Sequence, residues 1–70
     1  MPDQPHALVV NGAPQTVTAD TLAGAIVELG FGDRKVATAL NGAFVAVGQR
    51  AQTLLKAGDR IEVVSARQGG

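Results

Sequence analysis

Two Asn-Gly dipeptides, Asn11-Gly12 and Asn41-Gly42, constrain the fold of this chain more than any other feature of its sequence. Asparagine and glycine readily adopt the positive φ angles that the two-residue turn of a β-hairpin requires. Each dipeptide lies between two short stretches rich in apolar and β-branched residues, which is the pattern of a strand on either side of a turn. The sequence therefore predicts two β-hairpins.

Five strands are predicted: residues 8–10 and 15–18 around the first turn, residues 36–40 and 43–47 around the second, and residues 60–65 near the end of the chain. The last of these has the strongest strand propensity. Because residues 8–10 and 61–64 hold the densest runs of branched aliphatic side chains, we expect them to be neighbours at the centre of a sheet.

A helix is predicted between the two hairpins. Asp20 or Thr21 can cap its N-terminus, and Gly30 can end it as the C′ residue. Its apolar face repeats at helical spacing and comprises Leu22, Ala25, Ile26 and Leu29. Gly24 lowers the helix propensity by about 1 kcal/mol relative to alanine, so the segment is either weak or tightly packed there. Glu28 is expected to be a solvated charge on the opposite side.

The segments that connect the predicted strands and helix contain few distinctive residues. In residues 30–35 we expect Phe31 to plug the end of the core and Arg34 and Lys35 to be solvated. Residues 48–52 are expected to be irregular, residues 53–55 to bring two apolar side chains inward, and residues 57–59 to form a turn.

The order strand, strand, helix, strand, strand, strand predicts an α+β fold of the ubiquitin-like β-grasp kind. It consists of a mixed five-stranded sheet with one main helix across one face. Seventy residues leave room for one domain. We expect a flexible N-terminal tail over residues 1–6, the β-grasp domain over residues 7–66 and a flexible C-terminal Gly-Gly tail over residues 67–70.

Strand alternation divides the side chains between two faces of the sheet. The side chains expected to point at the helix are Leu8, Val10, Thr38, Leu40, Ile61 and Val63. The other face is expected to carry Val9, Ala37, Ala39 and Val64 and to be short of charge. Such a face is either a docking surface or a set of scattered exposed residues without a role.

Composition excludes several classes of function. The formal net charge is zero and the longest basic cluster is Arg34-Lys35, so we expect no nucleic-acid partner. The chain has no cysteine, and its one histidine, His6, lies in the predicted tail without a companion, so we expect no catalytic triad and no metal site. Asp59 and Glu62 are explained by a surface turn and a solvent-facing strand position. We therefore expect a protein that is not an enzyme.

Targeting signals are not evident in the sequence. The opening residues 1–5 contain neither a basic nor an apolar region of the kind found in a secretory signal. No apolar run approaches membrane-spanning length. We therefore expect a soluble cytoplasmic protein.

The chain ends in Arg67-Gln68-Gly69-Gly70, an unhindered backbone leading to a carboxylate. The segments 8–12, 36–45 and 55–64, followed by this Gly-Gly, resemble the thiamine-biosynthesis sulfur carrier family (ThiS). The specific part of the resemblance is Gly58-Asp59-Arg60-Ile61-Glu62 followed by the terminal glycines. The chain departs from the family at residues 46–51, where members often have Pro-Arg and then an aromatic residue.

The resemblance implies a carrier cycle centred on Gly70. Its carboxylate would be adenylated with ATP and Mg²⁺ by an E1-like adenylyltransferase (ThiF-like), and this chain itself would bind no cofactor. Sulfur from a persulfide enzyme would then give a thiocarboxylate, which thiazole synthase (ThiG-like) would consume. Gly69 would thread a narrow channel of the partner, and Gln68 would tether the tail there. Arg67 would either tether the tail through its planar guanidinium or be a solvated strand end.

Two alternatives to this function stay open. A carrier of the same fold could serve molybdopterin synthase or another thiolation pathway, although the proline-rich run usual before the Gly-Gly of the molybdopterin carrier does not occur in residues 65–68. A ubiquitin-like interaction domain with an inert terminus is the other alternative.

Overall fold

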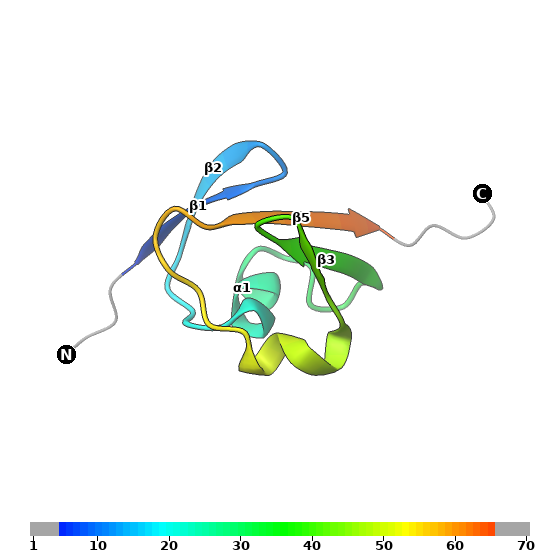
Figure 1. Cartoon of the computed structure of the whole chain (residues 1–70). Helices are drawn as coiled ribbons and strands as arrows, with labels where there is room; N and C mark the ends of the chain where they lie inside the picture. The colour runs from blue at the N-terminus through cyan, green and yellow to red at the C-terminus, as the bar shows by residue number, and fades with distance from the viewer. Residues whose placement is uncertain (1–4, 66–70) are drawn as a thin grey trace.

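The computed structural model describes residues 5–65 and places all five predicted strands in one mixed sheet (Figure 1). The strands are β1 (His6–Val10), β2 (Ala13–Val17), β3 (Val36–Leu40), β4 (Ala43–Val45) and β5 (Arg60–Ser65), in the order β2-β1-β5-β3-β4. β1 and β5 are parallel neighbours, whereas the other pairs are antiparallel. With one α-helix on one face, this is the predicted ubiquitin-like β-grasp fold, and the predicted central pair of strands is confirmed.

Both hairpins turn at their Asn-Gly dipeptides. Asn11 and Asn41 have φ angles of 52° and 51°, and the glycines that follow them have φ angles of 84° and 88°. Each turn contains only these two residues, because Val10 pairs with Ala13 and Leu40 pairs with Ala43 across the turns. The strand ends differ slightly from prediction, since β2 covers residues 13–17 rather than 15–18 and β4 ends at residue 45 rather than 47.

The helix α1 (Leu22–Glu28) begins and ends as predicted. The Thr21 hydroxyl caps it by accepting a hydrogen bond from the Gly24 N–H, and Gly30 follows the helix with a φ angle of 95°. A Cβ atom at Gly24 would lie 2.8 Å from the Cβ of Ala19, closer than two carbon atoms approach without a shift. Gly24 is therefore explained by close packing against the preceding loop and not by a weak helix.

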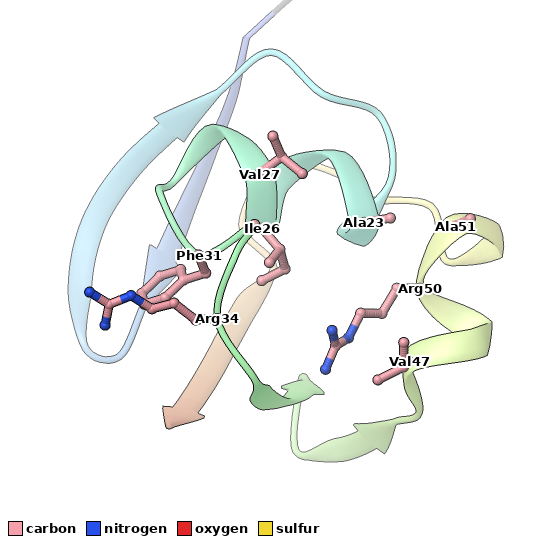
Figure 2. Close-up of a pocket in the computed structure, with 9 residues that line it drawn as sticks. Ala23, Ile26, Val27, Phe31, Arg34, Val47, Arg50 and Ala51 are labelled. Carbon is pink, nitrogen blue, oxygen red and sulfur yellow. The ribbon is translucent and has the colours of Figure 1, made fainter. Parts of the chain in front are cut away.

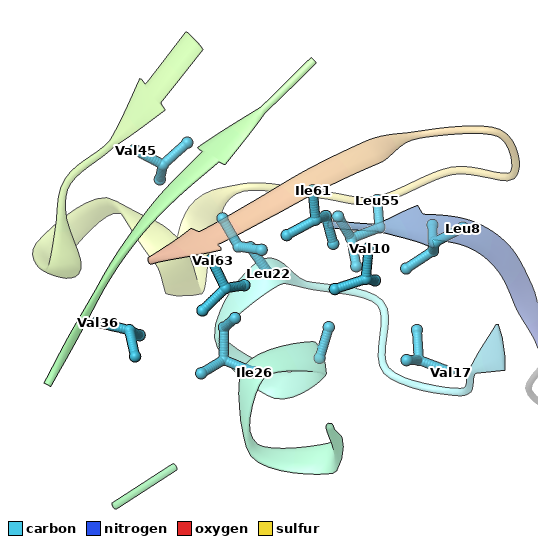
Figure 3. Close-up of a cluster of buried hydrophobic side chains, with 11 residues drawn as sticks. Leu8, Val10, Val17, Leu22, Ile26, Val36, Val45, Leu55, Ile61 and Val63 are labelled. Atoms are coloured by element: carbon cyan, nitrogen blue, oxygen red, sulfur yellow. The ribbon is translucent and has the colours of Figure 1, made fainter. Parts of the chain in front are cut away.

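The core lies between the sheet and α1, as Figure 3 shows. All six side chains predicted to face the helix are buried or packed against this core. Phe31 also packs against it at one end, as predicted. The largest fully buried side chains are contributed by different strands and by α1: Val17, Leu22, Thr38 and Ile61. Within residues 5–65, no helix is long and apolar enough to span a membrane.

Residues 46–55 form an ordered connection. A 3₁₀ helix, η1 (Val47–Gln52), occupies the segment predicted to be irregular. The Arg50 guanidinium ties it to β3 by donating from Nε to the Thr38 hydroxyl (3.0 Å) and from Nη2 to the Val36 carbonyl (2.6 Å). After η1, Leu55 is buried but Leu54 is exposed, so only one of the two side chains predicted to turn inward does so.

Glu28 has a structural role that the sequence analysis missed. Its carboxylate accepts hydrogen bonds from the Thr18 and Ala19 N–H groups at 3.0 and 3.1 Å and from the Thr18 hydroxyl at 3.2 Å. It therefore closes the connection between β2 and α1. The hydrogen bond from the Thr18 N–H is the main reason that the pKa of Glu28 lies below its ordinary value of 4.5.

Replacing Glu28 by glutamine is expected to make stability less dependent on pH. A carboxyl whose pKa is lowered by folding stabilises the native state above its unfolded pKa, and this contribution is lost as the pH falls through the folded value. Urea unfolding should show Glu28→Gln to be less stable than wild type at pH 7, with the difference shrinking below about pH 4.5. Glu62→Gln, at an exposed position of β5, is the control of matched charge. A difference that stays constant with pH would contradict this role.

Candidate functional site

β5 is the last described element before the C-terminal residues. It is the middle strand of the sheet, and its two neighbours are β1 on one side and β3 on the other. Its last residue, Ser65, pairs with Val36 of β3. The predicted tail residues lie outside the described part of the chain: Arg67, Gln68, Gly69 and Gly70. The structure therefore describes the strand from which they continue (Figure 1).

Two asparagine side chains hold β5 in register. The Asn11 amide bonds both backbone groups of Val63: its Oδ1 accepts from the Val63 N–H (2.8 Å), and its Nδ2 donates to the Val63 carbonyl (3.1 Å). Asn41 Oδ1 accepts from the Arg60 N–H at 2.9 Å. β5 pairs with β1 only through Arg60 and Ile61. β1 ends at Val10, and the Asn11 side chain in the following turn extends the hydrogen bonding along β5 to Val63. Both Asn-Gly turns thus stabilise the central strand as well as the hairpins.

Asp59 supports the start of β5 from a buried position. Its carboxylate accepts from the Lys56 N–H (2.9 Å) and from the Asn41 side-chain amide (3.1 Å). The prediction of a turn at residues 57–59 is confirmed by Gly58, whose φ angle is 90°. The interpretation of Asp59 as a surface residue is wrong, because the carboxylate turns inward to satisfy these two donors.

We use the term outer face for the side of the sheet that points away from α1. The cross-strand pairs place Val9, Ala37, Ala39 and Val64 together on it, as alternation predicted. Val64 is 63% exposed, and Phe44, the neighbour of Ala39 on β4, is 73% exposed. The register also places Arg60 beside Val9 and Glu62 beside Ala39, so the prediction that this face is short of charge is wrong. The outer face is apolar around Val64 and charged nearer the start of β5.

His6 is a strand residue and not a solvated tail residue. β1 begins at His6, and the ring Nε2 lies 3.2 Å from a carboxylate oxygen of Asp20. The side chain is 19% exposed, so the prediction that it has no companion is also wrong. The strand brings His6 next to the loop before α1, a contact between residues 14 positions apart. Among residues 5–65, no group of three or more His, Cys, Asp or Glu side chains is arranged to hold a metal ion.

Comparison with known proteins relates the chain to carriers of this fold. The sequence model described as the ThiS family matches residues 8–70. A solved structure, the thiamine biosynthesis protein (ThiS) from Geobacter metallireducens, is similar with a TM-score of 0.72 and 29% sequence identity. The match covers 91% of this chain and 99% of that protein. A comparison with curated proteins gives no match.

Proposed function

Because the chain belongs to the ThiS family, we propose that it is a sulfur carrier for synthesis of the thiamine thiazole ring. The observation that carries the proposal is the extent of the family match, which runs from Leu8 in β1 to Gly70. The similar structure from Geobacter metallireducens is named for thiamine biosynthesis, which supports the same pathway.

The proposed chemistry takes place on the carboxylate of Gly70. A carboxylate with a pKa near 3.5 is ionised at neutral pH and is a poor acceptor for a nucleophile. An E1-like adenylyltransferase would let a carboxylate oxygen attack the α-phosphorus of ATP, with pyrophosphate leaving. A persulfide sulfur would then attack the acyl carbon, with AMP leaving, and a thiol would reduce the resulting acyl disulfide to the thiocarboxylate. In this cycle the chain is a co-substrate, and ATP and Mg²⁺ are bound by the adenylyltransferase.

In this proposal the chain itself contributes β5, a strand held by several hydrogen bonds, directly before the reacting C-terminal residues. The hydrogen bonds between Asn11 and Val63, and the bond that the Arg60 N–H donates to Asn41, fix β5 as far as Val63. Gly69 lacks a Cβ and so suits a narrow channel in a partner enzyme. Gln68 and Arg67 would hydrogen-bond to that partner, Arg67 through its planar guanidinium.

We propose that the outer face docks on the adenylyltransferase. Val64 is an exposed apolar residue of this face and pairs with Ala37, and Phe44 is exposed on the same face beside Ala39. A charge at the centre of an apolar contact is desolvated without a partner. Val64→Asp is therefore expected to weaken binding by about tenfold or more, measured by calorimetry with the purified adenylyltransferase.

Leu54→Asp is the matched control for this prediction. Leu54 is also a large exposed apolar residue, but it lies outside the sheet, next to Thr21. We expect it to bind the adenylyltransferase with an affinity within about twofold of wild type, because a surface charge away from an interface has little effect. Equal losses in the two variants, with both still folded, would show that the outer face is not the docking surface.

The choice of synthase tests the pathway. The chain should bind thiazole synthase from the same organism in preference to the large subunit of molybdopterin synthase. Each purified synthase is titrated separately with the full chain. Preferential binding to the molybdopterin enzyme would assign the carrier to that pathway, and binding to neither would favour an interaction domain with an inert terminus.

A further inference from the structure

A second surface lies mainly on the side of the sheet that carries α1. It is a groove between α1, the loop over residues 30–35 and η1 (Figure 2). Its walls include Val27 from α1 and Val47 from η1, which are 66% and 70% exposed. Phe31, half-buried against the core, also lines it. Exposed valines on two facing elements provide an apolar surface for one inserted side chain.

The same groove is lined by three basic residues. Arg34 and Lys35 are exposed in the loop, and Arg50 crosses from η1 toward β3. These three are half of the six Lys and Arg residues of a chain whose formal net charge is zero. No aspartate or glutamate is among the described residues that line the groove. The charge of the chain is therefore unevenly distributed, with cations gathered around an apolar hollow.

Arg50 is held in place before any ligand arrives. Its Nε and Nη2 bond the Thr38 hydroxyl and the Val36 carbonyl, and these two bonds use only part of the five N–H donors of a guanidinium. Because the side chain is already ordered, a carboxylate that bonds the remaining donors causes little further loss of side-chain entropy. A preorganised cation beside an apolar wall favours a ligand that carries both an apolar group and negative charge.

We propose that this groove docks an acidic segment of a partner protein in which one apolar side chain is flanked by carboxylates. The apolar side chain contacts Val27, Phe31 and Val47, and the carboxylates pair with Arg34, Lys35 and Arg50. The groove lies mainly on the side of the sheet that carries α1, and its end beside Lys35 reaches Ala37 of the outer face. The binding itself does not depend on the sulfur-carrier function.

The test uses a synthetic peptide, acetyl-Glu-Glu-Leu-Glu-Glu-amide, titrated into the full chain and followed by NMR. The expected result is a saturable shift of the Val27 and Val47 methyl signals and of the Arg50 side-chain N–H signal. The double variant Arg34→Glu, Lys35→Glu is expected to bind at least about fivefold more weakly, because reversed charges repel the carboxylates. The variant Lys56→Glu, Arg60→Glu makes the same change of charge outside the groove and should bind within about twofold of wild type.

Several results would overturn the proposal. These are the absence of a saturable shift, an equal loss of affinity in both double variants, or a response at Phe44 and Val64 in place of the groove. If the groove signals shift in the absence of peptide, and the shift grows with protein concentration, a second copy of the chain occupies the groove. Shifts of the same signals on deletion of residues 66–70, without peptide, would identify the chain's own tail.

Discussion

Replacing Ile61 by alanine is expected to lower the free energy of unfolding by about 2–5 kcal/mol. Ile61 is 1% exposed and lies in the central strand, where it pairs with Val10 on one side and Leu40 on the other. Its truncation leaves a cavity between three strands and α1 that regular strands cannot collapse to fill. In a domain of this size such a loss is a large part of the total stability.

Val64→Ala is the matched control on the same strand. Val64 is three residues further along β5 and points to the outer face, so its truncation removes little buried area. We expect a change within about 0.5 kcal/mol, because surface substitutions usually have small effects. Urea unfolding followed by circular dichroism measures both variants. A similar destabilisation at the two positions would contradict the assignment of faces in β5.

Adding one alanine after Gly70 is expected to lower the rate of adenylation by about a hundredfold or more. The addition converts the Gly70 carboxylate into a peptide group, which removes the nucleophile. It also moves the new carboxylate by about 3.3 Å, one residue of extended chain, and shifts of about 1 Å in reacting atoms already cost large factors in rate. The readout is exchange of pyrophosphate into ATP by the E1-like adenylyltransferase in the presence of the chain.

An alanine inserted after Met1 is the control for this extension, because it changes chain length without altering the C-terminus. It should be adenylated at the wild-type rate. Calorimetry with the same enzyme separates docking from chemistry, since the extended chain keeps its outer face. Adenylation of the extended chain at the wild-type rate would show that Gly70 is not the reacting group.

The fold was predictable to the extent that local chemistry determines it. The turns at Asn11 and Asn41, the cap at Thr21 and the end of the helix at Gly30 depend on residues adjacent in sequence. The 3₁₀ helix η1 was not predictable in this way. It is tied to the sheet by Arg50, whose partners lie 12 and 14 residues away in β3. Glu28 was missed for the same reason, because its partners Thr18 and Ala19 lie 10 and 9 residues before it in the chain.

The features of the candidate site were also predictable where they depend on local sequence and not where they depend on distant contacts. Alternation correctly grouped Val9, Ala37, Ala39 and Val64 on one face, since it is a local property of strands. The neighbouring charges of Arg60 and Glu62 follow from the same alternation and could have been found by applying it to every strand residue. The bonds from Asn11 to Val63 span 52 residues and follow only from the strand order.

The most direct test of the sulfur-carrier proposal is the intact mass of the full chain after incubation with the E1-like adenylyltransferase, ATP, Mg²⁺, a persulfide donor and a thiol. The proposal predicts a gain in mass equal to the exchange of one oxygen for one sulfur, confined to the C-terminal peptide. No gain in wild type, or the same gain in a chain that lacks Gly70, would contradict it.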